Sequence, residues 1–504
     1  MDTIFAHPVT LAVIAGFLLI AVIGKIMRAS FENIARWYLY VSAFSVIVVM
    51  NSIFFPFIGG KDYFFRFATE LSLAAVVLWW AFEARKGEFA ARVKELFRRP
   101  VTIAVTVFVA MFQIACAYAY DPSAAFWSNY ERGEGGFQML HYYLFFLLLV
   151  FLMKTEKQWK AFFKSSLIAG GIMVLYGIGG NYSLAGFIGP YSGQTAPVGW
   201  WHQLIDGRFQ GSLGNAAYVG AYLLFSMFYV GYLWTSDKIA GVLTAGKVWL
   251  YSIALAVALF FFGLSATRGA FIGLMLGIFV AVLYVVFATK GKTRKWGAVI
   301  LGILIILGIG IYADRKDPML QKIPEGRLLQ ISLSDATAQT RLMVWGEAWQ
   351  GFLLRPVTGW GPENFTAVYD KFFNPKFYVP GQSSETWFDR AHSIYFDYLA
   401  ETGILGFLSY FAIFAVLFTA LGKKFGRDEK ARNEAAAGAE TALHKHHVAL
   451  RFQQALLVAI PVAYLGQGIA IFDVFPMYIS IFGVFAFAAY YVSTKGLAHE
   501  LENH

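Results

Sequence analysis

The chain has 504 residues, of which 58% are hydrophobic, 18% aromatic and only 14% charged, and its mean hydropathy is +0.57. This composition excludes an ordinary soluble protein, whose surface carries more charge, and it also excludes a disordered tail protein. The single cysteine, Cys116, excludes an intramolecular disulfide and a thiolate metal cage. The net charge of +10 would suggest nucleic acid for a soluble protein, but in a membrane protein basic residues first report orientation.

Apolar stretches long enough to cross a bilayer recur along the chain. A spanning helix needs about 20 apolar residues. We predict thirteen, at approximately 9–26, 37–58, 64–84, 101–119, 138–153, 161–179, 215–234, 248–265, 269–288, 297–313, 397–421, 451–471 and 476–493. The first is not read as a signal peptide because its basic residues, Lys25 and Arg28, follow the apolar run. A re-entrant first segment would leave twelve spans, so the predicted fold is an all-α bundle of 12–13 transmembrane helices.

The basic residues are distributed unevenly between the two sides of this bundle. If the odd-numbered helices run inward, 27 of the 41 Lys and Arg residues fall on one side, which the positive-inside rule identifies as the cytoplasm. The predicted organisation is then one integrated membrane domain. It has ten helices over 1–313, a long extracytoplasmic loop over 314–392, and three helices over 393–504 with a cytoplasmic linker at 422–450. Because the net charge mostly reports orientation, we do not expect a nucleic-acid partner.

The long outer loop contains a predicted amphipathic helix. Between about Thr340 and Leu354, apolar side chains recur at helical spacing, namely Leu342, Trp345, Trp349 and Phe352. Such a helix is expected to lie flat at the membrane surface. An ordered loop of this length is usually a lid or a binding surface, so we expect the function on the outer face.

Two arginines on the predicted outer face suit an anionic ligand. Arg208 lies in a glycine-rich run just before the seventh span, and Arg268 lies in Ser265–Ala270, which connects two spans. A guanidinium group keeps its charge and donates in bidentate fashion, so a pair of them suits a diphosphate. The alternative is that these arginines face lipid headgroups at the membrane surface.

His392 closes the long loop at the start of the eleventh span. A histidine near a helix N-terminus has a lowered pKa because the helix dipole disfavours the imidazolium, and its ring then stays available as a base. A polar residue that caps the helix is the equal alternative. Asp389 would either oppose this shift or orient the ring. Asp473, in the last outer turn, would bind a hydroxyl group or cap that turn.

Several motifs occur together in a characteristic order. They are Tyr130–Gly135, Arg208 with Gly214 and Asn215, the turn around Arg268, then Arg341, Trp345, Pro356, Gly359 and Gly361 in the long loop, and finally His392 with Glu401–Gly406. From about Phe126 to the C-terminus, the chain thereby resembles the O-antigen ligase and polymerase superfamily of bacterial envelope glycosyltransferases. The resemblance implies supporting roles for Glu131, Arg132 and Arg341. The family signature usually has His-Asn where this chain has His392-Ser393.

The resemblance implies a glycosyltransferase of the ligase type in the bacterial inner membrane. A glycan carried on undecaprenyl diphosphate would pass to a hydroxyl group of a glycolipid or protein acceptor on the periplasmic face. Because a diphosphate is already a good leaving group, Arg208 and Arg268 would stabilise its charge without a metal. His392 would act as the general base, and direct attack on the anomeric carbon predicts inversion. The expected partners are this donor, the acceptor and the lipid bilayer, and we expect no cofactor and no metal site.

Other functions remain as alternatives at this point. Within the superfamily, ligation to a lipid A core, polymerisation of repeat units and transfer to a pilin-type protein share these residues. A metal-dependent oligosaccharyltransferase would need acidic ligands in the first outer loop, which is only Gly59–Asp62. A transporter of lipid-linked glycans would need charged residues within the spans, where Glu70, close to an end, is the nearest case.

Overall fold

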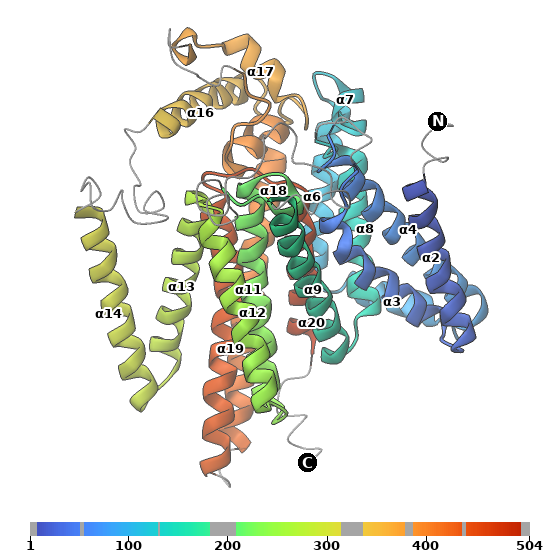
Figure 1. Ribbon diagram of the computed structural model, residues 1–504, viewed down its shortest axis with the longest axis vertical. Helices are drawn as coiled ribbons and strands as arrows, with labels where there is room; N and C mark the ends of the chain where they lie inside the picture. The colour runs from blue at the N-terminus through green and yellow to red at the C-terminus, as the bar shows by residue number, and fades with distance from the viewer. Residues whose placement is uncertain are drawn as a thin grey trace.

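The computed structural model describes residues 8–50, 55–129, 132–181, 208–313, 336–378, 387–435 and 440–494, and within these ranges it contains helices and no strands (Figure 1). Ten of the described helices are long and apolar enough to cross a membrane. They are α4 (Gly59–Phe82), α6 (Pro100–Ala117), α9 (Glu156–Asn181), α11 (Ala216–Ile239), α12 (Ala245–Leu264), α13 (Arg268–Ala288), α14 (Gly291–Ala313), α18 (Ile394–Ala435), α19 (Glu440–Gln467) and α20 (Phe475–Ser493).

Two shorter apolar helices also correspond to predicted membrane spans. They are α2 (Pro8–Ile26) and α8 (Gly136–Leu152), which coincide with the predicted spans 9–26 and 138–153. With the ten longer helices, twelve of the thirteen predicted spans coincide with an apolar helix. The predicted fold class, an all-α polytopic membrane bundle, is therefore confirmed.

The predicted span 37–58 is wrong in its bounds. The helix there, α3 (Phe31–Ser42), begins earlier, where the Ser30 hydroxyl accepts a hydrogen bond from the Asn33 N–H at 3.3 Å. It tightens into the 3₁₀ helix η1 (Ala43–Ile47), after which Val48 is extended. Pro56 lies in the rest of the predicted span, and a proline inside a helix removes a backbone hydrogen bond. Hydropathy alone could not detect this break because the residues remain apolar.

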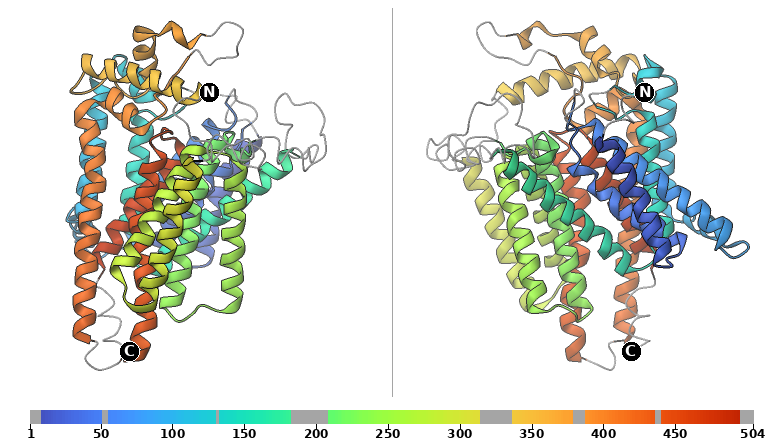
Figure 2. Two further views of the ribbon diagram at one scale, coloured as in Figure 1. Left: turned by 90° about the vertical axis from the view of Figure 1, so that its left-hand side faces the viewer. Right: turned by 45° about the vertical axis from the view of Figure 1, so that its right-hand side comes forward.

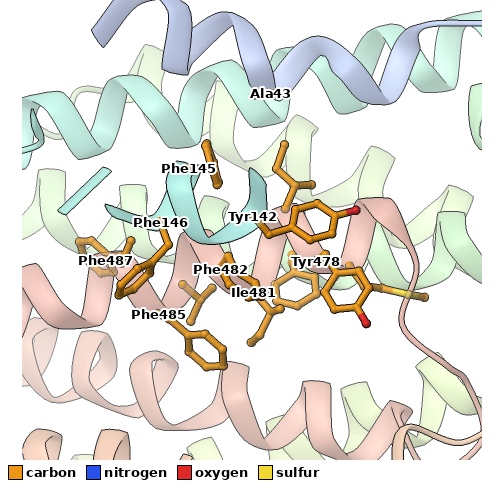
Figure 3. Packing of buried hydrophobic residues seen from close by; sticks show 14 of the residues in the cluster. Ala43, Tyr142, Phe145, Phe146, Tyr478, Ile481, Phe482, Phe485 and Phe487 are labelled. Carbon is orange, nitrogen blue, oxygen red and sulfur yellow. The ribbon is translucent and has the colours of Figure 1, made fainter. Parts of the chain in front are cut away.

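The centre of the bundle is formed by α11 and α20. In their most apolar windows, 89% and 83% of residues are buried, against 6% in α14, which lies at the edge (Figure 1). Aromatic rings fill the contact between α8 and α20, where Tyr142 and Tyr478 stack with centroids 4.8 Å apart (Figure 3). Close packing of large rings gives this core a rigid frame.

The loops gather at two opposite ends of the bundle. At one end, which we call the site end, the Tyr120 N–H donates to the Trp360 carbonyl at 2.7 Å. There Lys61 also donates to the Ser212 carbonyl at 2.8 Å. At the other end, Lys160 pairs with Asp237 at 2.9 Å. This arrangement agrees with the alternation of loops predicted from the sequence.

The described part of the predicted long loop is a folded cap, residues 336–378 and 387–393. It contains α16 (Ala336–Leu354), α17 (Phe365–Phe372) and the 3₁₀ turn η4 (Pro375–Phe377), packed around a small hydrophobic core of their own. Figure 2 shows α16 lying across the ends of the membrane helices. Trp345 stacks on Phe396 of α18, whereas Leu342 and Trp349 are 42% and 47% exposed. Only part of the predicted apolar face therefore remains free to meet the membrane surface.

A glycine-rich turn fastens the cap to α18. The N–H groups of Trp360 and Gly361 donate to the carbonyls of Ala400 and Glu401 at 2.9 and 2.7 Å. Here α18 is kinked at Gly403, whose φ of +61° favours glycine. A Cβ on Gly359 would lie 2.4 Å from the backbone of Glu401, so the two segments meet only because this residue has no side chain.

The described residues of the predicted cytoplasmic linker 422–450 are helical. The helix α18 runs on to Ala435, and α19 begins at Glu440. Alanine and charged residues favour a helix, so both spanning helices extend past their apolar parts.

Candidate active site

The candidate site gathers around the turn 468–474 between α19 and α20. On one side of this turn, a Cβ on Gly269 would lie 3.0 Å from Ile471, so the start of α13 packs directly against it. On the other side, the ring of Phe472 lies against the ring of His392 with centroids 5.0 Å apart. The turn therefore lies between His392 and the end of α13 that carries Arg268.

The backbone and ring of His392 are both held by their neighbours. Its φ is +58°, a left-handed conformation that costs energy for a residue with a side chain. The ring Nδ1 lies 3.0 Å from the Arg390 carbonyl. Because a carbonyl only accepts hydrogen bonds, Nδ1 carries the proton and Nε2 keeps its lone pair. Within the described part of the protein, Nε2 has no hydrogen-bond partner.

Burial lowers the pKa of His392 to about 4. The hydrogen bond to the Arg390 carbonyl raises the pKa, Arg341 lowers it, Asp389 raises it and Arg132 lowers it. The direction agrees with the sequence-based expectation, but the main cause is burial and not the dipole of α18, which begins two residues later. The ring is therefore neutral at ordinary pH and can accept a proton.

Asp389 binds Arg132 and does not orient the histidine ring. The Arg132 guanidinium donates from Nε to Oδ2 at 2.5 Å and from Nη2 to Oδ1 at 3.0 Å, a bidentate pair. Its Nη1 donates to the Tyr218 hydroxyl at 2.9 Å, and the group lies over the Phe472 ring. Burial raises the pKa of Asp389, but Arg132 outweighs this effect and the pKa is lowered. The pair thus connects the loop before α8, the helix α11 and the cap.

Arg390 is the centre of a buried ionic cluster that was not predicted. Its guanidinium pairs with Glu401 at 2.8 Å, with Glu363, and with Glu134 at 3.6 Å. Burial raises the pKa of Glu134 well above its usual value, although Arg390 opposes this effect. These contacts fix the segment just before His392 to α18, to the cap and to the loop before α8.

Asp473 accepts hydrogen bonds from protein hydroxyl groups. Its Oδ2 lies 3.3, 3.2 and 2.5 Å from the hydroxyls of Tyr398, Tyr410 and Tyr464. Burial raises the pKa of Asp473 to about 6, and the three tyrosines oppose this effect. Of the two predicted roles, this geometry favours a structural one, because the carboxylate anchors the turn 468–474 to α18 and α19.

The two predicted arginines meet at one turn. Arg208 donates from Nε to the Ser265 carbonyl and from Nη2 to the Thr267 hydroxyl, both at 2.9 Å. Arg268 follows directly as the first residue of α13. Thr267 also donates to the Ala216 carbonyl at 3.1 Å, which ties this turn to α11. Arg208 is exposed and Arg268 half-buried, so both cations are at the surface of the site end.

Arg341 belongs to the cap and lies near His392, whose pKa it lowers. One helical turn later in α16, the Trp345 indole N–H donates to the Ala391 carbonyl at 3.0 Å and so holds α16 over the residue before His392. The supporting residue Glu131 lies outside the described residues. His141 of α8 lies 3.0 Å from Glu70 of α4 and, within the described part of the chain, forms no hydrogen bond or ion pair with the residues around His392.

Sequence reasoning missed Tyr218, Phe472 and Arg390. Tyr218 and Phe472 are aromatic residues among many, and no spacing distinguishes them. The position of Arg390 could have indicated its importance, because it lies between Asp389 and His392 in a run already selected for its polar residues.

The fold and this site define a polytopic helical membrane protein with a polar site beneath a helical cap at one end. Residues 253–411 match the family model described as O-antigen ligase. This segment extends from α12 into α18 and contains Arg268, Arg341 and His392. Over this segment, the predicted resemblance to the O-antigen ligase and polymerase superfamily is confirmed. No curated protein matches the chain.

Proposed function

We propose that this protein is a glycosyltransferase of the O-antigen ligase type. It moves a glycan from undecaprenyl diphosphate to an acceptor hydroxyl group on the outer face of the plasma membrane. The family match over residues 253–411 supports the class of enzyme. The observation that carries the proposal is the lone pair of His392 Nε2, on one side of the turn 468–474, with the start of α13 packed against the other side.

The chemistry follows from these groups. The acceptor hydroxyl gives its proton to Nε2 of His392 as its oxygen attacks the anomeric carbon. The bond between this carbon and the diphosphate oxygen breaks, and the electron pair leaves with the lipid diphosphate. A single displacement inverts the configuration. General-base assistance contributes roughly 10²- to 10⁴-fold.

Arg208 and Arg268 stabilise the charge that develops on the leaving diphosphate. Guanidinium groups stay protonated and offer several donors to phosphate oxygens, so this step needs no metal ion. The hydrogen bonds of Arg208 to the turn 265–267 bring its charge to the residues just before Arg268.

The cap and the buried ion pairs hold the reacting groups in place. Arg390 and the pair of Arg132 with Asp389 fix the segment that carries His392, and α16 covers it. A covered site keeps out water, which would otherwise compete with the acceptor hydroxyl.

The test is transfer by the purified protein in the presence of EDTA. A polyprenyl-diphosphate-linked glycan is offered with three acceptors in turn: lipid A core, the same lipid-linked glycan, and a pilin-type peptide. Release of the lipid diphosphate with the glycan on one acceptor supports the proposal and identifies ligation, polymerisation or protein glycosylation. If the protein binds the donor but no acceptor triggers release, the proposal fails and a transport role gains support.

A further inference from the structure

A cleft of about 1070 Å³ opens at the end of the bundle opposite the candidate active site. It lies between the junction of α5 (Glu88–Leu96) with α6, the distal part of α18 and the end of α20. Figure 2 shows α18 running from the cap to this opposite end. At 1.5 Å per residue, Lys423 is roughly 40 Å along α18 from its first residue, so the cleft is separate from the site around His392.

The rim of the cleft is strongly basic. Among the described residues, five cations and one acidic residue, Glu95, line it, and the cations are Arg98, Arg99, Lys423, Arg427 and Lys430. The three on α18 follow at intervals of four and three residues, which places them on one helix face. Of the acids beside them in the described part of α18, Asp428 pairs with Lys424 at 2.8 Å and Glu429 pairs with Arg451 at 3.2 Å.

Hydrogen-bond donors in the cleft lack acceptors. Arg99 donates from Nη2 to Glu95 at 2.8 Å, but its Nε and Nη1 are buried and have no hydrogen-bond partner among the described residues. Buried donors without partners are costly, so a bound acceptor would be favourable after a small rotation of the side chain. The side chains of Arg98 and Lys423 are exposed and have no hydrogen-bond or ion-pair partner within the described residues. Pro100, the first residue of α6, also lines the cleft, so the positive end of that helix dipole adds to the field.

The deeper walls are apolar. Ala415, Val416 and Ala420 of α18 and Val492 of α20 line the cleft beside the cations. The first three belong to the membrane-spanning part of α18. A ligand that fits both regions has an anionic head at the level of the cations and a hydrocarbon part along these walls.

We propose that this cleft binds the phosphate headgroup of an anionic phospholipid, with the start of an acyl chain along α18. The cations attract the phosphate, and Arg99 supplies the donors that otherwise lack acceptors. The lipid thereby fastens the α5–α6 junction to the distal end of α18. This inference does not depend on the proposed transferase activity.

The test uses the full-length protein in detergent and native mass spectrometry of bound lipid. The protein is expected to bind much more phosphatidylglycerol than phosphatidylcholine. Inorganic phosphate at the same concentration is not expected to displace the phosphatidylglycerol. The double variant Arg98→Gln with Lys423→Gln removes two unpaired cations and is expected to weaken phosphatidylglycerol binding roughly 10- to 30-fold.

The matched control removes two exposed cations from the same end of the bundle, by Lys292→Gln and Arg294→Gln, outside the cleft. It is expected to bind phosphatidylglycerol like the wild type. If both double variants lose phosphatidylglycerol binding equally, the binding depends on general surface charge and the proposal is overturned. Equal binding of both lipids, or displacement by inorganic phosphate, would overturn it as well.

Discussion

The surroundings of His392 give the two nitrogens of its ring different protonation states. The Arg390 carbonyl fixes the proton on Nδ1, and the rings of Phe388 and Phe472 hold the imidazole edge-on from two sides. A base prepared in this way needs no movement to receive a proton. The residue is therefore the one whose loss tests the mechanism most directly.

Replacement of His392 by alanine is expected to reduce transfer by about 10²- to 10⁴-fold, because the acceptor hydroxyl loses its base. The measurement is the release of lipid diphosphate by the purified variant. His141→Gln is the matched control, since His141 also lies at the site end but pairs with Glu70. It is expected to transfer at the wild-type rate. Normal transfer by the His392→Ala variant would remove this residue from the mechanism.

The pH dependence of transfer follows from the pKa of His392, which burial lowers to about 4. Because the neutral ring is the active form, lowering the pH from 7 to 5 is expected to leave this step unchanged. Below about pH 4 the rate should fall about tenfold per pH unit. The measurement is the initial rate of lipid diphosphate release against pH, with reversibility checked by return to pH 7. A fall centred near 6.5, the ordinary pKa of histidine, would contradict the buried environment.

Arg132 and Asp389 are expected to stabilise the site end only when both are present. Their side chains are 15% and 12% exposed, and removal of one partner leaves a mostly buried charge, at a cost of about 3 kcal/mol. Arg132→Met and Asp389→Leu alone should each lower the melting temperature in detergent. The double variant should be more stable than either single variant. Additive losses would show that the two charges act independently.

At the scale of elements, the kink in α18 allows the cap to dock. Gly403 has φ +61° and ψ −166°, a region that only glycine adopts readily, and a Cβ there would lie 2.4 Å from the Val357 carbonyl oxygen. The contact between the turn and the kinked part of α18 thus needs a residue without a side chain on both sides, which are Gly359 and Gly403. This explains why glycines at these positions accompany the family-like motifs.

Gly403→Ala is expected to lower the free energy of unfolding by more than about 1–3 kcal/mol, because backbone strain and a steric clash act together. Gly422→Ala in the same helix is the matched control. No atom lies within 4 Å of a Cβ at Gly422, so alanine should be neutral or stabilise by up to about 1 kcal/mol. Thermal unfolding in detergent measures both. Changes of the same sign and size would show that the kink does not depend on glycine.

At the scale of the whole molecule, the sequence predicts the membrane-spanning helices, because they depend on hydropathy along the chain. Hydropathy located twelve of the spans, since burial in lipid requires continuous apolar helices. It failed around Pro56, where apolar residues do not form a helix. His392 and Arg268 were selected for their positions at helix starts, and the structure places His392 and the start of α13 on two sides of the turn 468–474, while their functional roles remain predictions. The partners of Arg390 come from positions 134, 363 and 401, and no periodicity connects such distant residues.

The two ends of the bundle differ in charge, and this difference predicts their orientation. The segments predicted at the end opposite the cap hold 27 of the 41 basic residues. Basic residues in short loops are retained in the cytoplasm, so the cap and His392 are expected on the outer face. A donor carried on undecaprenyl diphosphate reaches His392 only if this orientation is correct.

Cysteine labelling tests this orientation without a background signal, because the single cysteine, Cys116, is buried. Ser123, at the site end, and Lys292, at the opposite end, are both exposed. In intact spheroplasts, an impermeant maleimide is expected to label the Ser123→Cys variant at once and the Lys292→Cys variant only after permeabilisation. The reverse pattern would place His392 in the cytoplasm, where a nucleotide sugar would replace the lipid-linked donor as the natural candidate.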